Sequence, residues 1–196
     1  MKRAFDIIAS GLGLICISPL FAILALWIKS DSKGPVFYRQ TRVGKDNKDF
    51  RLYKFRSMRP DSDKFGLITV GGHDPRVTRS GYYIRKYKLD EFPQLINVFK
   101  GDMSLVGPRP EVRKYVDLYT PEQLHVLDVR PGITSLASIR YRNENEILAA
   151  SDDPDRTYIE QVMPDKLAID LEYVSRASLL TDIKLIFSTF HEILTK

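Results

Sequence analysis

Two adjacent carboxylates, Asp90 and Glu91, are the residues of this sequence best placed for chemistry. Cations precede them in Arg85-Lys86-Tyr87-Lys88, and a rigid Gly-Pro-Arg-Pro segment that contains Arg109 follows them. An ionised carboxylate can act as a nucleophile, and arginine binds phosphate oxygens through paired hydrogen bonds. The pattern therefore suits an anionic substrate. The plainer interpretation is that Asp90 caps a helix and that Glu91 is a solvated acid in its first turn.

A helix is predicted to position this pair of carboxylates. Proline is tolerated only in the first turn of a helix, so Pro93 predicts a helix that begins near Asp90 and runs to about Lys100, where Gly101 ends it. Both carboxylates would then lie at the positive end of the helix dipole. Ionised aspartate is favoured there, and free N–H groups at this end can hold a phosphate.

Further cations lie on a predicted β-hairpin. Residues 35–41 predict one strand, and residues 50–56 predict a second strand after a polar connection. In the second strand aromatic or aliphatic residues alternate with cations, so Arg51, Lys54 and Arg56 either project toward a ligand or form a solvated face. The following residues, 60–75, predict a loop that is a candidate for ordering over a bound substrate.

The charge of the chain is unevenly distributed. Its 196 residues, 43% of them hydrophobic, suffice for one domain with a sizeable core. Residues 1–100 carry 19 Lys and Arg against 9 Asp and Glu, whereas residues 101–196 carry 11 against 16. The cationic half suits nucleic acid, an anionic membrane surface or a polyanionic small substrate. Cys16 is the only cysteine, so no internal disulfide can form, which fits a reducing compartment. The three histidines show no metal-ligand spacing.

An uncharged segment of 22 residues, 7–28, predicts insertion into a membrane. As a helix it would be roughly 33 Å long, which is enough to cross a bilayer. A basic start before an apolar run also occurs in secretory signal peptides. No persuasive small-residue cleavage site precedes Lys29, however, which argues against that alternative.

Two features favour a re-entrant helix pair over a spanning helix. Ser18-Pro19 predicts a sharp bend, because proline lacks an N–H and pushes the preceding residue out of the helical region. Basic residues flank both ends of the segment, so a spanning helix would leave positive charge on the translocated side. These residues are Lys2, Arg3, Lys29 and Lys33. A spanning helix kinked at the proline is the alternative, and the residues alone leave both topologies open.

The rest of the chain predicts mostly helices. They are expected over residues 78–88, 111–119, 121–129, 158–175 with an interruption at Pro164, and 179–196, with a turn at 131–134. The last helix is amphipathic and suits either the core or a membrane surface. The predicted fold is therefore α+β, with an N-terminal re-entrant membrane helix pair, a small antiparallel sheet, and several helices that include interfacial amphipathic ones.

Motifs along nearly the whole chain resemble the bacterial sugar transferases, the monotopic polyprenyl-phosphate phosphoglycosyl transferases. Each motif alone is weak, but their order and spacing together are specific. The motifs are Lys2-Arg3-Ala4-Phe5-Asp6, Ser18-Pro19, Gly34-Pro35-Val36-Phe37-Tyr38-Arg39-Gln40, Tyr53-Lys54-Phe55-Arg56-Ser57-Met58, Asp74-Pro75-Arg76-Val77-Thr78, Leu89-Asp90-Glu91-Phe92-Pro93-Gln94-Leu95-Ile96-Asn97-Val98, residues 100–110 ending in Gly107-Pro108-Arg109-Pro110, and Arg130-Pro131-Gly132-Ile133-Thr134.

The resemblance implies a membrane enzyme of the small, single-catalytic-domain type. Residues 1–30 would form a re-entrant helix bent at Ser18-Pro19, and residues 31–196 a continuous catalytic domain on the cytoplasmic face of the inner membrane. Lys2 and Arg3, together with the hinge, would meet lipid phosphate. The implied reaction moves a phosphosugar from a UDP-sugar to undecaprenyl phosphate and releases UMP, as the first membrane step of glycoconjugate assembly. The expected partners are the UDP-sugar, polyprenyl phosphate and membrane lipid, without nucleic acid. A homodimer stays open.

The Asp-Glu dyad of the family falls on Asp90 and Glu91. Breaking a pyrophosphate bond requires an ionised nucleophile, neutralised phosphate oxygens and a stabilised leaving nucleotide. In the expected ping-pong mechanism, Asp90 attacks the sugar-linked phosphorus, and polyprenyl phosphate then attacks the acyl-phosphate with Glu91 as general base. Mg²⁺, with Asp90 as a ligand, would neutralise the phosphates. The residues expected to bind substrate or phosphate are Lys54, Arg56, Arg85, Arg109, Arg142 and Asn143.

Three alternatives remain beside this mechanism. In the first, Asp90 only ligates Mg²⁺ and the lipid phosphate attacks directly in a ternary complex. In the second, the chain is a membrane-tethered nucleic-acid binder, although it has no recognisable nucleic-acid motif and the dyad would be unexplained. In the third, it is a scaffold on anionic lipid with the dyad as a helix cap, which predicts that Asp90→Asn leaves every activity unchanged.

Residues 135–143 depart from the pattern of the family. Arg142 and Asn143 fit it, whereas Ser135, Ser138 and Tyr141 do not. If this region lines the sugar pocket, the donor sugar differs from that of better-known members.

Overall fold

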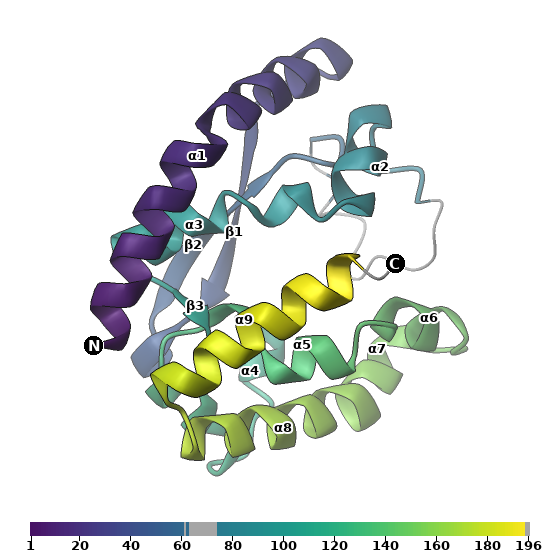
Figure 1. The fold of residues 1–196 in the computed structure, drawn as a ribbon. Helices are drawn as coiled ribbons and strands as arrows, with labels where there is room; N and C mark the ends of the chain where they lie inside the picture. Colours follow the sequence, from purple (N-terminus) through teal and green to yellow (C-terminus); the bar gives the residue numbers. More distant parts are fainter. Residues whose placement is uncertain (61, 63–73, 195–196) are drawn as a thin grey trace.

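The computed structural model describes residues 1–60, 62 and 74–194. Helices and two small two-stranded sheets make up the chain, which confirms a mixed α and β fold with one long apolar helix at the N-terminus. Figure 1 shows this helix along one edge of the molecule beside the hairpin, with the C-terminal helices gathered at the other side. Most of the predicted substrate loop, residues 60–75, lies outside the described residues.

The N-terminal helix, α1 (Lys2–Asp31), is one continuous helix, so the predicted re-entrant pair is not confirmed. Pro19 lies inside it and cannot donate a hydrogen bond to the carbonyl of Ile15. The hydroxyl of Ser18 donates to that carbonyl instead, with an O···O distance of 2.8 Å. Because the carbonyl keeps a donor, the helix continues through the proline, and Figure 1 shows α1 changing direction along its length without a break.

α1 buries little of its surface against the protein. Within the described residues it is the one helix long and apolar enough to cross a membrane. Only 11% of its most apolar stretch of 18 residues is buried inside the protein. Its buried residues are Asp6, Ser10, Leu24 and Ile28. Its exposed large apolar side chains are Ile7, Ile8, Leu12, Ile15, Ile23, Leu26 and Trp27. A continuous apolar surface of this kind suits lipid.

Both ends of α1 are fastened to the same folded body. At the start, Lys2 Nζ forms an ion pair with the carboxylate of Asp182, a buried residue of the C-terminal helix α9 (Leu179–Leu194). At the end, Asp31 Oδ2 accepts hydrogen bonds from the backbone N–H of Ser80 at 2.8 Å and from its hydroxyl at 2.7 Å. The helix therefore lies along the protein and does not project from it.

The predicted hairpin is confirmed. Strand β1 (Phe37–Val43) pairs antiparallel with β2 (Asp49–Phe55), with Phe37 opposite Phe55 and Val43 opposite Asp49. A 3₁₀ turn, Lys45–Asn47, connects the strands. Phe55 joins Leu24 and Ile28 of α1 in a buried cluster, so the hairpin packs on the membrane helix.

The dyad lies on a 3₁₀ turn between two helices. Helix α2 (Arg79–Lys86) confirms the helix predicted over residues 78–88. The 3₁₀ turn Leu89–Glu91 follows, and then α3 (Gln94–Lys100), which ends as predicted at Gly101 with φ 101°. The predicted start of α3 near Asp90 is wrong. Lys88 adopts a left-handed φ of 56°, which turns the chain after α2, and residues 89–91 then form the 3₁₀ turn, so the α-helix begins only at Gln94.

A second, parallel sheet was not predicted. Strand β3 (Ser104–Val106) pairs with β4 (Gly132–Thr134), where the sequence predicts a turn at 131–134. The two strands approach so closely that a Cβ atom on Gly132 would lie 2.1 Å from the backbone nitrogen of Gly107. Strands of three residues are too short to show an alternating pattern.

The C-terminal half is helical, as predicted, with different boundaries. Its elements are α4 (Arg113–Val116), a 3₁₀ helix (Gln123–Asp128), α5 (Leu136–Arg140), α6 (Glu144–Ala149), α7 (Pro154–Thr157), a π-helical turn (Tyr158–Val162), α8 (Met163–Ser175) and α9. The helices expected over 111–119 and 121–129 are thus much shorter than predicted. The helical segment continues across Pro164: the π-helical turn Tyr158–Val162 leads directly into α8, and the proline lies in the first turn of α8.

Candidate functional site

The dyad carboxylates lie in a cluster of cations from three parts of the chain. Their side chains are 14% and 17% exposed. Lys54 Nζ, from β2, lies 3.2 Å from Glu91 Oε1 and 4.0 Å from Asp90 Oδ2. Arg109 Nη2 lies 2.5 Å from Glu91 Oε1, and its Nη1 lies 3.5 Å from Oε2. Glu91 is therefore held by two cations, whereas Asp90 has only one, and more distant, ion-pair partner in the described structure.

This difference separates the pKa values of the two carboxyls. Burial raises the pKa of Glu91, but the charges of Arg109 and Lys54 outweigh it and hold that pKa well below its usual range. Burial also raises the pKa of Asp90, and the neighbouring Glu91 charge adds to it, while Lys54 and Arg85 lower it without cancelling the rise. Adjacent acids with divergent pKa values suit different chemical roles.

Asn97 positions Lys54 against the dyad. Its side chain is fully buried in α3, and its amide nitrogen donates to Arg51 O at 2.8 Å. The oxygen of the same amide accepts a hydrogen bond from Tyr53 N at 2.9 Å. Because both contacts lie on β2 next to Lys54, the strand is locked in register with the helix that follows the dyad.

The short parallel sheet positions Arg109. Gly107 N donates to Thr134 O at 3.1 Å, and Gly132 N donates to Pro108 O at 2.9 Å. β4 therefore holds the backbone of the Gly-Pro-Arg-Pro segment in place through hydrogen bonds. The side chain of Arg109 extends from this segment toward Glu91.

Arg56 is not part of this cluster, although the sequence made it a candidate. The residue is only 5% exposed and donates from Nη1 to Lys33 O at 2.6 Å and from Nη2 to Ser32 O at 2.7 Å. These carbonyls belong to the chain just after α1. Arg56 therefore has a structural role, because it closes the end of the membrane helix.

Lys2 and Arg3, which the sequence assigns to lipid phosphate, have protein partners in the structure. Besides its pair with Asp182, Lys2 Nζ donates to Val106 O at 3.0 Å. Arg3 Nη1 donates to Val98 O at 2.6 Å. Both cations fasten the start of α1. The predicted hinge, Ser18-Pro19, lies on the exposed middle of the helix, away from the dyad.

The other predicted phosphate-binding residues divide into two groups. Arg85, at the end of α2, is near enough to the dyad for its charge to act on Asp90. Arg142 and Asn143 are exposed on the turn before α6. Their neighbour Glu144, which was not predicted, lines a cavity beside Arg109.

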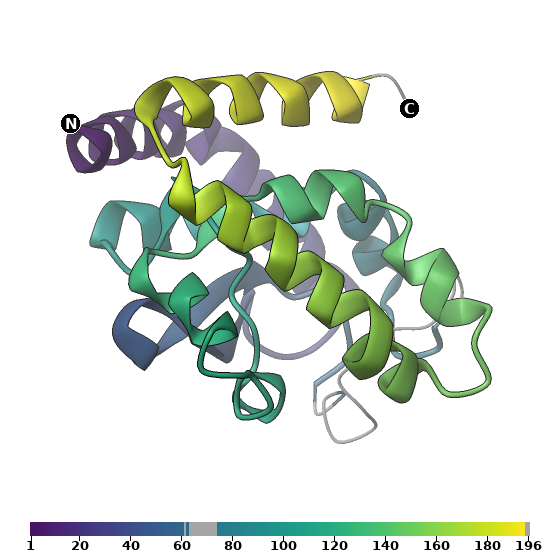
Figure 2. The same ribbon diagram turned by 90° about the horizontal axis from the view of Figure 1, so that it is seen from below.

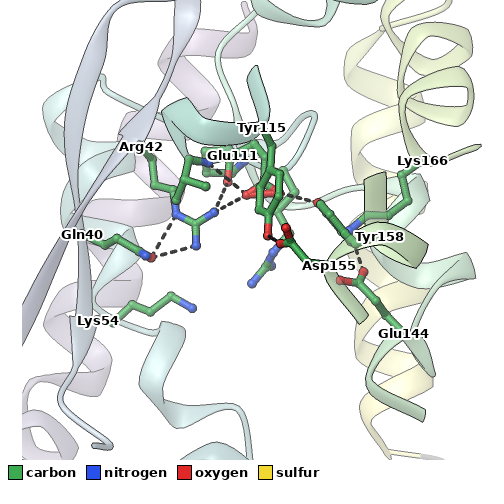
Figure 3. Close-up of polar contacts among 12 residues, drawn as sticks. Gln40, Arg42, Lys54, Glu111, Tyr115, Glu144, Asp155, Tyr158 and Lys166 are labelled. Atoms are coloured by element: carbon green, nitrogen blue, oxygen red, sulfur yellow. Dashed lines mark hydrogen bonds and ion pairs between the residues drawn. The ribbon is translucent and has the colours of Figure 1, made fainter. Parts of the chain in front are cut away.

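This cavity has a volume of about 270 Å³ and extends from Arg85 and Arg109 toward the C-terminal helices. Figure 3 shows Gln40 and Arg42 from the hairpin on one side, Tyr158, Lys166 and Glu144 from helical segments on the other, and Lys54 close by. Glu111 and Asp170 also line it. These residues that line the cavity beside Arg109 were not predicted from the sequence. Only Glu111, directly after the Gly-Pro-Arg-Pro segment, had a local signal.

The dyad fits a magnesium ion only if the substrate supplies most of its ligands. The described residues contain no group of three or more His, Cys, Asp or Glu side chains arranged to hold a metal. Glu91 is engaged by Arg109 and Lys54, which leaves Asp90 as the carboxylate with oxygens to offer. Mg²⁺ commonly takes one or two carboxylates together with substrate phosphates and water, so this donor set is compatible with it.

Comparison with known proteins covers the whole chain. The family model described as bacterial sugar transferase matches residues 1–196. The chain is 42% identical to the UDP-N-acetylgalactosamine-undecaprenyl-phosphate N-acetylgalactosaminephosphotransferase of Aeromonas hydrophila, over 100% of this chain and 44% of that protein. It is 40% identical to the UDP-glucose:undecaprenyl-phosphate glucose-1-phosphate transferase of Escherichia coli K12, over 96% of this chain and 39% of that protein. It is also 40% identical to the exopolysaccharide production protein PSS of Rhizobium leguminosarum bv. phaseoli, over 100% and 96%. The chain thus spans less than half of the first two relatives and nearly all of the third.

Proposed function

Because the chain belongs to the bacterial sugar transferase family, we propose that it transfers a sugar phosphate from a UDP-sugar to undecaprenyl phosphate. The products are undecaprenyl-diphosphate-sugar and UMP. The names of two relatives, which act on UDP-N-acetylgalactosamine and UDP-glucose, support this reaction class. The observation that carries the proposal is the asymmetry of the dyad, in which Asp90 is loosely paired while Arg109 and Lys54 hold Glu91 ionised.

In the first half-reaction, a carboxylate oxygen of Asp90 attacks the phosphorus that carries the sugar. A bond forms between Asp90 and phosphorus, the bond from phosphorus to the bridging oxygen breaks, and UMP leaves with the electron pair. Lys54, Arg85 and Arg109 stabilise the charge on the phosphate oxygens. Mg²⁺, when bound, would neutralise further oxygens of the diphosphate.

In the second half-reaction, an oxygen of undecaprenyl phosphate attacks the same phosphorus. The bond between phosphorus and Asp90 breaks, and the electron pair returns to the carboxylate. The second pKa of a phosphate monoester is about 6, so the lipid phosphate arrives largely as a dianion and needs no base. Glu91 has a pKa held well below its usual range and is a weak base. We therefore assign Glu91 the positioning of Arg109 and Lys54, in place of the general-base role expected from the sequence.

We place the protein on the cytoplasmic face of the inner membrane, with α1 re-entrant and not spanning. A helix of 30 residues is roughly 45 Å long. Both of its ends contact the same folded body, through Lys2 with Asp182 and through Asp31 with Ser80. A spanning helix would separate these contacts by the thickness of the bilayer, so the contacts favour a helix that enters and leaves one leaflet.

The C-terminal helix extends the proposed membrane face. Figure 2 shows α9 and part of α1 along the same face of the molecule. Leu180 and Phe187, seven positions apart on α9, are 73% and 70% exposed. An amphipathic helix with such an outward stripe suits the interface of a bilayer. The dyad would then lie close to the headgroup layer, where the phosphate of the lipid acceptor is found.

The test is a single-turnover assay without lipid acceptor. Protein in nanodiscs is mixed with Mg²⁺ and a panel of UDP-sugars that includes UDP-glucose and UDP-N-acetylgalactosamine. We expect a stoichiometric burst of UMP and an intact-mass increase of one sugar phosphate. Asp90→Asn should show neither, whereas the matched control Asp152→Asn, in an exposed loop, should show both.

The other outcomes separate the alternatives. If UMP is released only after undecaprenyl phosphate is added, direct attack in a ternary complex replaces the covalent route. If wild-type protein releases no UMP from any UDP-sugar, even with the acceptor present, the assignment of the reaction is wrong.

A further inference from the structure

We propose that the cavity beside Arg109 binds the sugar ring of the donor, and that Asp170 accepts a hydrogen bond from a hydroxyl or amide group of that sugar. The inference rests on the proposed function and goes beyond it, because it names the part of the substrate that this cavity recognises. Asp170 would be a specificity-determining residue that touches the substrate away from the reacting phosphorus.

The position of the cavity relates it to the reacting phosphorus. Arg109 and Arg85 line it, and both also act on the dyad, through the contact with Glu91 and through the charge felt by Asp90. A phosphate held by these arginines would lie at the mouth of the cavity. The sugar is bonded directly to the phosphorus that Asp90 attacks, whereas uracil is separated from it by ribose and a second phosphate. With this phosphate at the mouth of the cavity, the sugar is therefore closer to the cavity than the uracil is.

The size of the cavity agrees with this assignment. Its volume of about 270 Å³ lies near the lower end of the range of small-molecule pockets, roughly 300–1,000 Å³. A single pyranose ring suits such a space better than a whole nucleotide sugar.

One wall of the cavity is a polar network whose groups already have partners. Arg42 Nη1 lies 2.6 Å from Glu111 Oε1, and Gln40 Oε1 accepts from Arg42 Nη2 at 2.7 Å. The hydroxyl of Tyr158 donates to Glu111 Oε2 (Figure 3). Because these polar groups are hydrogen-bonded to one another, this wall of the cavity is rigid and its groups need no ligand as a hydrogen-bond partner.

Away from Arg85 and Arg109, the charges of the cavity lining disfavour a second anion. Glu111, Glu144 and Asp170 face the cavity, and both glutamates already have cationic partners, Arg42 and Lys166 respectively. An additional phosphate would meet carboxylates without a free counter-charge in this wall. A neutral polyol with several hydroxyl donors is the ligand class that matches it.

Asp170 lines this cavity, and the backbone N–H groups of Ala137 and Arg109 and the hydroxyl of Ser135 act on its carboxylate as hydrogen-bond donors. The residue is only 5% exposed, and its Oδ1 atom is buried without a hydrogen bond within the described part of the chain. Burial raises the pKa of Asp170 to about 6, although Lys166 partly offsets the effect. A buried acceptor oxygen without a donor is unfavourable, and a sugar hydroxyl or N-acetyl amide that enters the cavity would supply one further donor to this carboxylate.

The test compares the donor with a ligand that lacks the sugar. Steady-state UMP release gives KM and kcat for UDP-glucose and UDP-N-acetylgalactosamine, and calorimetry gives the Kd of the preferred UDP-sugar and of UMP. For Asp170→Asn we expect KM and Kd of the UDP-sugar to rise at least tenfold, with the Kd of UMP changed less than twofold. Gln40→Ala, at the opposite wall, is a second probe and should also weaken the UDP-sugar selectively. Glu172→Gln, an exposed acid on the same helix, is the matched control and should leave all values within twofold.

Three results would overturn the inference. A proportional rise in the Kd of UMP for both probes would place the nucleotide, and not the sugar, in the cavity. Unchanged UDP-sugar binding in both variants would show that the cavity does not contact the donor. If the wild-type protein neither binds nor turns over any UDP-sugar, the proposed function fails as well, which distinguishes that failure from the first two.

Discussion

Replacing Arg109 by glutamine should separate its structural role from its part in catalysis. The change removes the guanidinium that lies 2.5 Å from Glu91 Oε1 and leaves a carboxylate, 17% exposed, with Lys54 as its remaining cation. Removing one partner of a buried ion pair destabilises a protein by roughly 3–5 kcal/mol. Because the Arg109 side chain is 37% exposed and Lys54 remains, we expect the free energy of unfolding to fall by about 1–3 kcal/mol.

The rate of UMP release should fall further than stability alone would explain. Loss of one preorganised donor to a developing oxyanion lowers kcat by about 10²–10³-fold. In the double variant Arg109→Gln/Glu91→Gln the unpaired carboxylate is gone, so stability should recover while the rate stays low. Chemical unfolding in detergent, followed by circular dichroism, measures the first effect, and UMP release from the UDP-sugar measures the second.

Arg113→Gln is the matched control for this experiment. Arg113 is 38% exposed and lies 2.5 Å from Asp49, as Arg109 does from Glu91, but Asp49 is 48% exposed. Its loss should change stability by less than about 1 kcal/mol and leave the rate unchanged. Equal destabilisation by both arginine variants would refute the burial argument. Recovery of activity in the double variant would refute a direct contact between Arg109 and phosphate.

Three further predictions follow from single contacts. Because burial raises the pKa of Asp90 and only the ionised carboxylate attacks, the rate of the UMP burst should rise with pH, with an apparent pKa above the ordinary aspartate value. Rapid-quench measurements across a pH series test this, and a rate that levels off at about pH 4 would contradict it. Ser18→Ala removes the donor to Ile15 O, so detergent unfolding should show a loss of about 0.5–1.5 kcal/mol. Gly132→Ala brings a Cβ atom within 2.1 Å of Gly107 N, so folded yield should collapse on size-exclusion chromatography, and a normal yield would show that the parallel strands do not approach as described.

Some elements were predictable because their signals are local. The hairpin shows two strand-like runs with a polar connection between them, and in the second run aromatic or aliphatic residues alternate with cations. The expected pairing is observed between β1 and β2. The end of α3 was equally accessible, since Gly101 adopts the positive φ that glycine tolerates. The start of α3 was not, because nothing in the sequence near Lys88 marks its left-handed conformation.

Other elements depend on contacts between distant residues, which no spacing reveals. β3 and β4 have three residues each and become strands only by pairing with one another. Lys54 and Arg56 have the same charge and lie two positions apart, yet one contacts the dyad and the other closes the end of α1. Asp170 on α8 reaches the cavity only through the packing of the C-terminal helices. The sequence therefore indicated the centre of the candidate site, whereas its wall required the fold.

Asp6 connects α1 to the Gly-Pro-Arg-Pro segment that carries Arg109. It is buried in α1, and its Oδ1 atom accepts hydrogen bonds from Ser104 Oγ and Leu105 N, both at 3.1 Å. Both donors belong to β3, and the Gly-Pro-Arg-Pro segment follows that strand directly. This buried contact therefore links the position of α1 to that of β3 and of the segment that carries Arg109. In the proposed reaction the acceptor phosphate comes from the membrane that α1 contacts and must reach a phosphorus held near Arg109. Because α1 is hydrogen-bonded to β3, and β3 leads into the segment with Arg109, the fold sets the distance between the membrane surface and Arg109.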